Sequence, residues 1–310
     1  MKQSGCSFFA VISIALQLCL VGSEGMAQER PRTASTPAIP KKIISLAPSV
    51  TEILFALGLG DRLVGVTTFC NYPPEAQRIA KIGDFINPNV EAIIAKKPDL
   101  VIGVSGATDP DKARQMERLG LKVTLVPVPT LQKILSSIRL IADLGGKEAA
   151  GERLVSSLQA QINRVHKAVG RAPRRSVLMV VGLQPLIAVG KKNFIDELIT
   201  LAGGENITGG VAQPWLNLPT EYVVAKAPQV IIEAGMGTEQ EESGKRWADL
   251  KSIPAVKERR IYSYRSDKIL RPGPRFGEAL EEIARLIHPE CFAEANRNLK
   301  NGNGCEGPRP

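Results

Sequence analysis

The chain has 310 residues, of which 44% are hydrophobic, and a formal net charge of +9 at neutral pH. This length allows two cores of about 100 to 150 residues each. The excess of positive charge does not indicate a nucleic-acid-binding protein, because no basic run with interleaved aromatic residues occurs. It fits attraction to an anionic ligand or lipid, or a merely solvated surface.

The first 27 residues have the pattern of a secretory signal peptide. Lys2 forms a basic start, residues 8–21 form an uncharged apolar run, and Gly25 and Ala27 fit a cleavage after Ala27. The run is about 14 residues long, shorter than the roughly 20 that cross a bilayer. We therefore expect a periplasmic protein released by cleavage. An uncleaved anchor helix and a lipid-modified Cys19 are the alternatives.

From residue 41 onward, apolar strand-like runs alternate with helical patterns. The runs of the first half are IISLA, LVGVTTF, LVIGV and KVTLVPV, with helices predicted over 49–58, 90–97 and 109–119. The second half continues with the runs QVIIEA and RIYSY and with helices predicted over 193–203, 246–250 and 276–287. Such alternation predicts βαβ units around parallel sheets that helices cover on both faces.

Two helical patterns separate the halves. The first covers 131–144 and ends at Gly145 and Gly146, which is a C-cap signal. The second covers 148–169 and carries one apolar stripe, formed by Leu154, Leu158, Ile162, Val165 and Val169. A helix of this length measures roughly 33 Å and would hold two lobes stiffly apart. An ordinary packing helix within one large domain is the alternative.

These patterns predict the following organisation of the chain. A signal peptide covers 1–27, a flexible leader 28–40, an N-terminal α/β lobe 41–146, a connecting helix 147–170, a C-terminal α/β lobe 171–290 and a disordered tail 291–310.

The sequence contains an internal repeat, with VEAIIAKKPDLVI at 90–102 and the similar TEYVVAKAPQVII at 220–232. Each copy reads as a helix followed by a strand, with Glu91 or Glu221 in the first helical turn. The N-terminus of such a helix lies at the edge of the sheet where α/β proteins bind ligands. An acidic residue in a first turn can also simply stabilise the helix dipole. We interpret Glu52 in this second way, as part of a capping box that begins at Ser49.

Several stretches resemble the periplasmic vitamin-binding proteins of cobalamin ABC importers, within the class III group that also includes siderophore and haem carriers. They are residues 42–76, 88–103, 202–207 and 271–290, and the resemblance extends over 41–290. It implies two Rossmann-like α/β lobes with central parallel sheets, joined by a long rigid helix. It also implies a dimeric permease, with its ATPase subunits, that docks one glutamate of each lobe; Glu91 and Glu221 match these two. We expect the binding protein to be a monomer.

The resemblance also implies a ligand site between the lobes. Phe69, Phe85 and Trp215 match aromatic positions of the family, and Tyr72 lies nearby in the sequence. Asp267 to Arg271 match a ligand-contacting stretch of the second lobe. Phe69 and Phe85 replace larger or hydroxylated aromatics, and a tryptophan of the family is replaced near Val104 and Ser105. We expect cobalamin or a related corrinoid as ligand, with a ferric siderophore or haem as the alternative.

Catalysis and metal binding have little support in the sequence. Residues 103–107 nearly form the nucleophile motif G-x-S-x-G but end in Ala. The two histidines, His166 and His288, fall on the connecting helix and at the end of the last predicted helix. A P-loop is absent from the sequence, and the one G-x-G-x-x-G spacing, at 302–307, falls in the predicted tail and not between a strand and a helix. We therefore expect no enzyme, no resident cofactor and no metal site.

Three cysteines remain after the predicted cleavage, Cys70, Cys291 and Cys305, and no two form a C-x-x-C pair. In an oxidising compartment Cys291 and Cys305 could form a disulfide and leave Cys70 free. Three unpaired thiols are the alternative.

Overall fold

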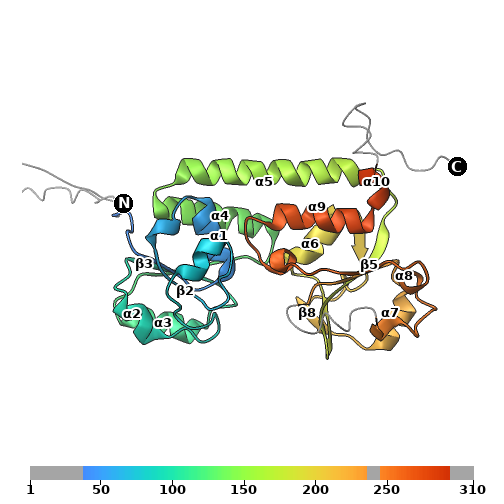
Figure 1. The fold of residues 1–310 in the computed structure, drawn as a ribbon, viewed down its shortest axis with the longest axis horizontal. Coiled ribbons are helices and arrows are strands. Elements are labelled where there is room, and N and C mark those ends of the chain that lie inside the picture. Colours follow the sequence, from blue (N-terminus) through green and yellow to red (C-terminus); the bar gives the residue numbers. More distant parts are fainter. Residues whose placement is uncertain (1–37, 236–244, 294–310) are drawn as a thin grey trace, which may run out of the picture. The chain divides into compact units, whose positions relative to one another are not determined.

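The computed structural model describes residues 38–235 and 245–293 (Figure 1). The predicted signal peptide, most of the predicted leader and residues 294–310 lie outside this part of the chain. Among the described helices, none combines the length and the apolar character that crossing a membrane requires.

The N-terminal lobe contains a four-stranded parallel sheet in the order β2-β1-β3-β4. Its strands are β1 (Ile43–Ser45), β2 (Leu63–Val66), β3 (Leu100–Val104) and β4 (Val123–Val126). Its helices are α1 (Pro48–Ala56), α2 (Val90–Ala95), α3 (Pro110–Arg118) and α4 (Leu131–Gly145), with 3-10 turns η1 (Gly60–Arg62) and η2 (Pro74–Arg78). All residues of β1 and β3 are buried. Such continuous apolar strands are typical of a parallel sheet covered on both faces.

The C-terminal lobe contains a sheet in the order β10-β9-β5-β6-β8, with β7 also paired to β5. Its strands are β5 (Arg175–Leu183), β6 (Leu186–Val189), β7 (Gly204–Asn206), β8 (Trp215–Asn217), β9 (Val230–Glu233) and β10 (Ile261–Ser263). Its helices are α6 (Phe194–Leu201), α7 (Thr220–Lys226), α8 (Pro254–Lys257), α9 (Phe276–Ile287) and α10 (Pro289–Ala293), with 3-10 turns η4 (Lys245–Trp247) and η5 (Asp267–Leu270).

The second sheet has the expected parallel part, formed by β5, β7, β9 and β10, and adds two antiparallel strands that the sequence analysis did not predict. Strands β6 and β8 run antiparallel to their neighbours, whereas β7, β9 and β10 pair in parallel. The reason is the connection between β5 and β6, which is only Gln184 and Pro185. Parallel strands need a crossover of about a dozen residues, so a connection this short forces a hairpin.

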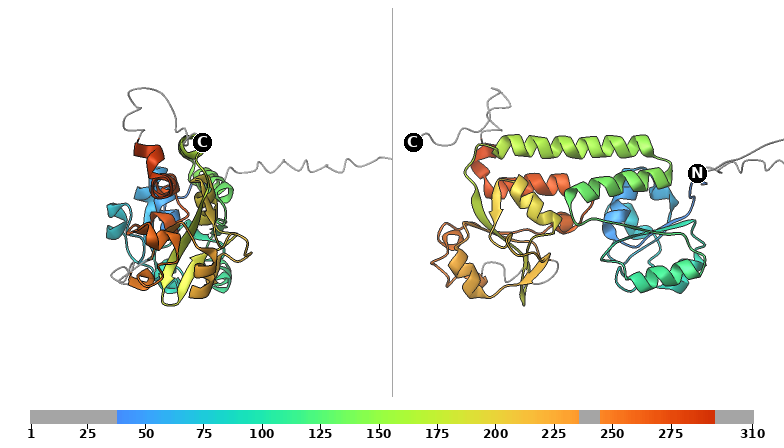
Figure 2. Two further views of the ribbon diagram at one scale, coloured as in Figure 1. Left: turned by 90° about the vertical axis from the view of Figure 1, so that its right-hand side faces the viewer. Right: turned by 180° about the vertical axis from the view of Figure 1, so that it is seen from behind.

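The long helix between the halves is confirmed as α5 (Glu148–Val169), a helix of 22 residues. Its buried side includes Leu158, Ile162, Val165 and Val169 of the predicted stripe. It packs against α4 of the first lobe and α9 of the second (Figures 1 and 2). At Gly151 a side chain would come within 2.5 Å of Ala142 Cβ on α4, so only glycine allows this helix crossing. One apolar core therefore continues from lobe to lobe through α5.

Helix α4 begins and ends at the residues that the sequence suggested. The Thr130 side chain accepts a hydrogen bond from Lys133 N at 3.2 Å, and Gly146 ends the helix in the left-handed conformation, with φ at 65°. Glycine adopts this conformation without the steric cost that other residues incur.

Two predicted segments near the C-terminus differ in the structure. The predicted helix over 246–250 is the 3-10 turn η4, and Trp247 is fully buried with its indole N–H donating to Glu233 Oε1 at 2.6 Å. The prediction of a disordered tail from 291 is wrong for its first residues. Cys291 and Phe292 belong to α10 and are buried, because Phe292 packs under the guanidinium of Arg285, 4.6 Å from the ring centroid.

A carboxylate of the second lobe caps a helix of the first. Leu131 N, at the start of α4, donates to Glu197 Oε2 of α6 at 2.9 Å. Burial raises the pKa of Glu197 above its ordinary value, the Leu131 hydrogen bond opposes that shift, and the negative charge of Asp196 adds to it.

This raised pKa predicts a pH effect on stability. Between the ordinary pKa of about 4.5 and the raised value, the folded state binds more protons than the unfolded state, so this group adds stability as the pH falls. Glu197→Gln keeps an oxygen for Leu131 N–H but cannot titrate. We expect the unfolding free energy of the wild type, minus that of the variant, to be larger at pH 5 than at pH 7. Urea denaturation at pH 5 and at pH 7 measures this free-energy difference. Equal differences at the two pH values would refute the raised pKa of Glu197.

Candidate ligand-binding site

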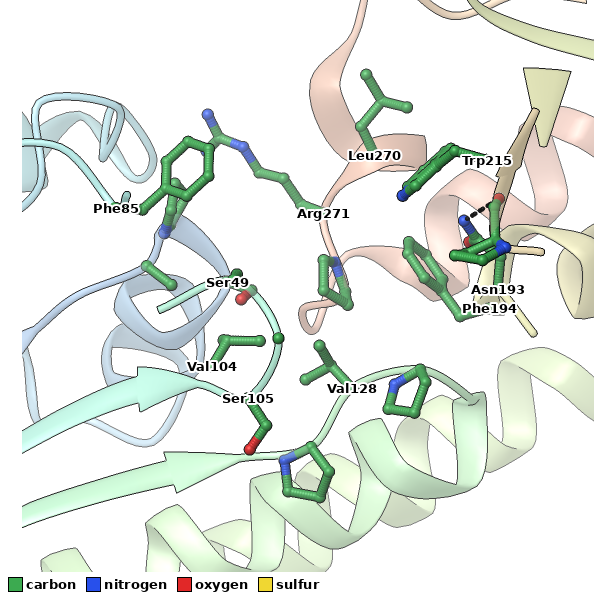
Figure 3. A pocket seen from close by; sticks show the side chains of 18 of the residues that line it. Ser49, Phe85, Val104, Ser105, Val128, Asn193, Phe194, Trp215, Leu270 and Arg271 are labelled. Atoms are coloured by element: carbon green, nitrogen blue, oxygen red, sulfur yellow. Dashed lines mark hydrogen bonds between the residues drawn. The ribbon is translucent and has the colours of Figure 1, made fainter. Parts of the chain in front are cut away.

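A cavity of about 780 Å³ is lined by residues of both lobes (Figure 3). The first lobe contributes Phe69, Phe85 and residues 47–49, 104–107 and 127–129, and the second contributes residues 192–194, 214–215 and 270–272. Residues 47–49, 104–107 and 127–129 lie at or just after the carboxyl ends of β1, β3 and β4. The cavity therefore lies at the sheet edge where α/β folds bind ligands, as the sequence predicted.

Aromatic rings from the two lobes contribute much of the cavity wall. The rings of Phe69 and Phe85 meet edge to face, with centroids 5.5 Å apart and an interplanar angle of 63°. Trp215 and Phe194 lie on the opposite wall (Figure 3). Phe69 is 50% exposed and Trp215 is 47% exposed. Large aromatic side chains left open to solvent on facing walls provide a surface for a broad apolar ligand.

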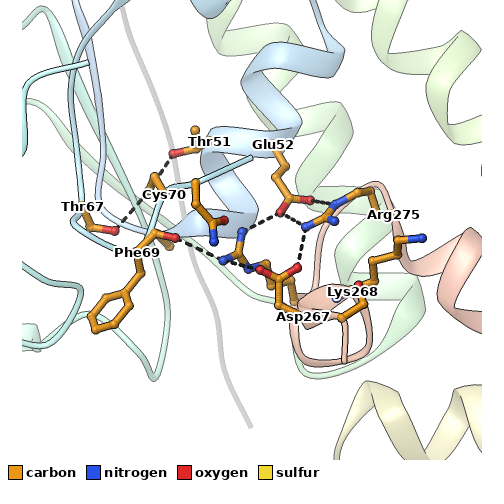
Figure 4. A network of polar contacts seen from close by, with 12 residues as sticks. Thr51, Glu52, Thr67, Phe69, Cys70, Asp267, Lys268 and Arg275 are labelled. Atoms are coloured by element: carbon orange, nitrogen blue, oxygen red, sulfur yellow. Dashed lines mark hydrogen bonds and ion pairs between the residues drawn. The ribbon is translucent and has the colours of Figure 1, made fainter. Parts of the chain in front are cut away.

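Four charged side chains, three of them buried and one half-buried, form a cluster beside the cavity (Figure 4). We call Glu52, Asp267, Arg271 and Arg275 the inter-lobe cluster, since Glu52 comes from α1 and the others from the second lobe. Arg271 contacts Glu52 at 3.0 Å and Asp267 at 2.6 Å, and Arg275 contacts Glu52 at 2.6 Å and Asp267 at 3.0 Å. Two positive and two negative charges make the cluster neutral, as a buried ionic group requires.

This cluster corrects the interpretation of Glu52 as a capping residue. Helix α1 begins at Pro48 after the N-cap residue Ala47, which makes no side-chain cap. The Glu52 side chain is fully buried and accepts hydrogen bonds from both arginines. Glu52 is therefore structural, as the sequence suggested, but it links the lobes instead of capping a helix.

The charges around Arg275 shift the pKa of its guanidinium. Its burial would lower the pKa of the guanidinium, but hydrogen bonds and charge from Glu52 and then Asp267 raise that pKa above its ordinary value. The Arg275 guanidinium also stacks 3.9 Å from the ring centroid of Tyr72. Arg275 is thus held as a cation between partners of this protein.

The six predicted ligand residues fall into two groups. Phe69, Phe85, Trp215 and Arg271 line the cavity. Tyr72 and Asp267 are not among the lining residues, and both contact Arg275 instead. Arg271 links the groups, because it also donates to the backbone oxygen of Phe69 at 3.1 Å. A direct ligand contact by Tyr72 or Asp267 stays a prediction.

Sequence reasoning missed the lining residues Lys192, Asn193 and Phe194. They connect β6 to α6, and Asn193 is the N-cap of α6, where its side chain accepts from Ile195 N at 3.0 Å. Asn193 also donates to the backbone oxygen of Pro214, beside Trp215, at 3.3 Å (Figure 3). The sequence signal was an Asn before a helical pattern, but β6 was not recognised, so the position at a strand end could not be inferred.

The two glutamates of the internal repeat occupy equivalent positions. Glu91 and Glu221 both lie in the first turn of their helices, α2 and α7, and both are exposed. Within the described residues neither forms an ion pair. Ile94 and Val224, three residues further on, are exposed apolar side chains at 38% and 37%. In each lobe the helix lies on the side away from α5 (Figure 1).

The near match to the nucleophile motif at residues 103–107 gains no support from the surroundings of Ser105. Ser105 lines the cavity, but in residues 38–235 and 245–293 no histidine does. His166 is exposed on α5. His288 is buried, with Nε2 3.1 Å from Gly203 O and Nδ1 3.1 Å from Glu290 Oε1. Ser105 thus has no histidine base among the residues around it.

Two of these three cysteines, Cys70 and Cys291, lie in the described part of the chain. Cys70 is buried, and its Sγ lies 3.1 Å from the hydroxyl oxygens of both Thr51 and Thr67. Cys291 is buried in α10, whereas Cys305 falls outside the described residues. A disulfide between Cys291 and Cys305 therefore stays a prediction.

Comparisons with known proteins agree with this geometry. The family model described as periplasmic binding protein matches residues 43–268. An uncharacterized ABC transporter substrate-binding lipoprotein of Bacillus subtilis is 34% identical over 263 residues, covering 82% of each chain. A vitamin B12-binding protein of Pectobacterium atrosepticum is 30% identical over 256 residues, covering 81% of this chain and 89% of that protein.

A solved structure of a protein named for a different ligand has a similar fold. The periplasmic heme-binding protein of Roseiflexus sp. RS-1, in apo form, superimposes with a TM-score of 0.72 at 29% identity, covering 81% of this chain and 99% of that one. Its identity is close to that of the vitamin B12-binding relative. Overall sequence identity therefore does not distinguish a corrinoid from haem as the ligand.

Proposed function

The chain belongs to the periplasmic binding protein family, the substrate-binding proteins of ABC importers, and we propose that it captures cobalamin or a related corrinoid for delivery to such an importer. Proteins of this family bind substrates without transforming them. Export through a cleaved signal peptide, a dimeric permease as partner and a monomeric state belong to the same proposal.

The observation that carries the proposal is the composition of the cavity wall. In the described part of the chain, no His, Tyr, Met or Cys lines the cavity. Haem carriers hold the iron through such an axial side chain. The cobalt of a corrinoid can keep its own lower base or a water, so it needs no ligand from the protein. Aromatic and aliphatic walls suit the flat corrin ring.

The siderophore alternative is weakened by the inter-lobe cluster. Anionic ferric siderophores require several uncompensated positive charges in the cleft. Arg271, which lines the cavity, and Arg275, beside it, are neutralised by Glu52 and Asp267. Lys192 is then the single lining cation without an ion-pair partner in the described residues. A wall of this kind favours a ligand of low charge.

Ligand titration tests the proposal. The chain has two tryptophans, of which Trp215 lines the cavity and Trp247 is fully buried. We expect cobalamin and cobinamide to quench the fluorescence of the mature protein, and Trp215→Phe to abolish most of that response. Haem and ferric catecholate complexes are the competing ligands in the same assay. Tighter binding of either competitor than of both corrinoids would overturn the proposal.

A further inference from the structure

We infer that Lys192 binds the phosphodiester of a corrinoid that carries its nucleotide loop, and so makes the protein prefer a complete cobalamin to cobinamide, which lacks this group. The inference rests on the proposed corrinoid function. It assigns a separate role to one side chain of the second lobe.

The first argument is the charge balance of the cavity. Within residues 38–235 and 245–293, the charged residues that line the cavity are Lys192 and Arg271, and no acidic residue of these ranges lines it. Arg271 lies within 3.0 Å of Glu52 and 2.6 Å of Asp267, so its charge is compensated. Lys192 forms no ion pair within the described residues and is exposed. The cavity therefore presents one uncompensated positive charge to its ligand.

The second argument is the match between that charge and the ligand. Cobalamin carries one phosphodiester on an otherwise amide-substituted, weakly charged corrin. Haem carries two carboxylates, and ferric catecholate complexes carry several negative charges. A single ammonium group on an apolar wall is complementary to a single anionic group, and charge complementarity of this kind selects among ligands of similar shape.

The third argument is the backbone at this position. Lys192 has φ at 65°, in the left-handed region that residues other than Gly, Asn and Asp adopt infrequently. Its neighbours hold it there: Lys191 N donates to Val211 O at 3.0 Å, and Asn193 caps α6. Conformations of this type are strained for residues that carry a Cβ atom, and they concentrate at functional sites.

The test compares two corrinoids and three variants. Lys192→Asn removes the charge and suits a left-handed backbone. We expect it to weaken cyanocobalamin binding about fivefold at low salt and to leave dicyanocobinamide binding within about twofold, the size of a solvent-exposed ion pair. Lys192→Arg keeps the charge and is expected to keep the preference for cyanocobalamin. Lys191→Asn makes the same charge change beside the cavity, outside its lining, and is expected to alter neither affinity.

The outcomes separate the two hypotheses. If the wild type binds neither corrinoid, the corrinoid function fails and the role of Lys192 fails with it. If both bind, and Lys192→Asn weakens both equally or neither, only the role of Lys192 is refuted. The salt dependence of the wild-type preference needs no variant. We expect the preference for cyanocobalamin to shrink as salt rises, and a salt-independent preference would argue against an ionic contact.

Discussion

Glu52→Met is expected to lower the free energy of unfolding by about 3 to 5 kcal/mol, because it leaves two buried arginines with one carboxylate between them. Met keeps the volume of the side chain, so the loss reports charge and not a cavity. Glu52 is the one acidic member that the first lobe contributes to the inter-lobe cluster. Its removal therefore also weakens the contact between the lobes.

Two comparisons make this prediction specific. Glu117→Met, on the exposed face of α3, changes a glutamate without a described ion pair and is expected to shift stability by less than about 0.5 kcal/mol. The double variant Glu52→Met with Arg275→Met leaves Arg271 paired with Asp267, so we expect it to be more stable than Glu52→Met alone. Urea denaturation of these variants and of Arg275→Met alone measures the losses. A double variant that loses the sum of the single losses would show that uncompensated charge is not the cause.

Under the proposed docking, in which Glu221 pairs with an arginine of the permease, Glu221→Lys is expected to reduce uptake through the importer at least about tenfold, since two positive charges would then repel each other by several kcal/mol. Ligand affinity should stay unchanged, because Glu221 does not line the cavity. Glu91→Lys should act in the same way from the other lobe. Uptake of labelled corrinoid into vesicles or cells, together with a titration of the purified variant, provides both measurements.

The matched control for this prediction is Glu205→Lys, an exposed glutamate of β7 in the same lobe. It makes the same charge change, and we expect normal uptake. Val224→Ser tests the exposed apolar neighbour of Glu221, which lies one helical turn away on the same face. Normal uptake by both Glu91→Lys and Glu221→Lys would exclude these glutamates as docking residues.

Periodicity and connection length decided which parts of the fold the sequence could predict. The stripe of α5 and the Gly146 cap of α4 depend on neighbours within a few residues, and both were predicted correctly. The hairpin of β5 and β6 was missed because its strands are buried apolar runs without alternation. A short apolar run does not reveal strand direction, and only the two-residue connection could have done so.

The sequence likewise allowed only part of the candidate site to be predicted. Phe69, Phe85 and Trp215 were found through resemblance, and all three line the cavity. Glu52 was misinterpreted because its partners, Arg271 and Arg275, are 219 and 223 residues away. A local capping motif was the only explanation visible at short range. Lys192 escaped notice for another reason: its importance comes from the neutralisation of the other cavity cation, which only coordinates show.

The polypeptide passes between the lobes once, through α5, and the inter-lobe cluster joins them again at α1. The first junction is apolar packing, which tolerates salt, and the second is ionic and shielded from water. A third contact, the hydrogen bond from Leu131 N to Glu197 Oε2, also joins the lobes. We therefore expect the lobes to move by small angles as ligand is loaded and released, without the wide swing of a single-hinge clamp.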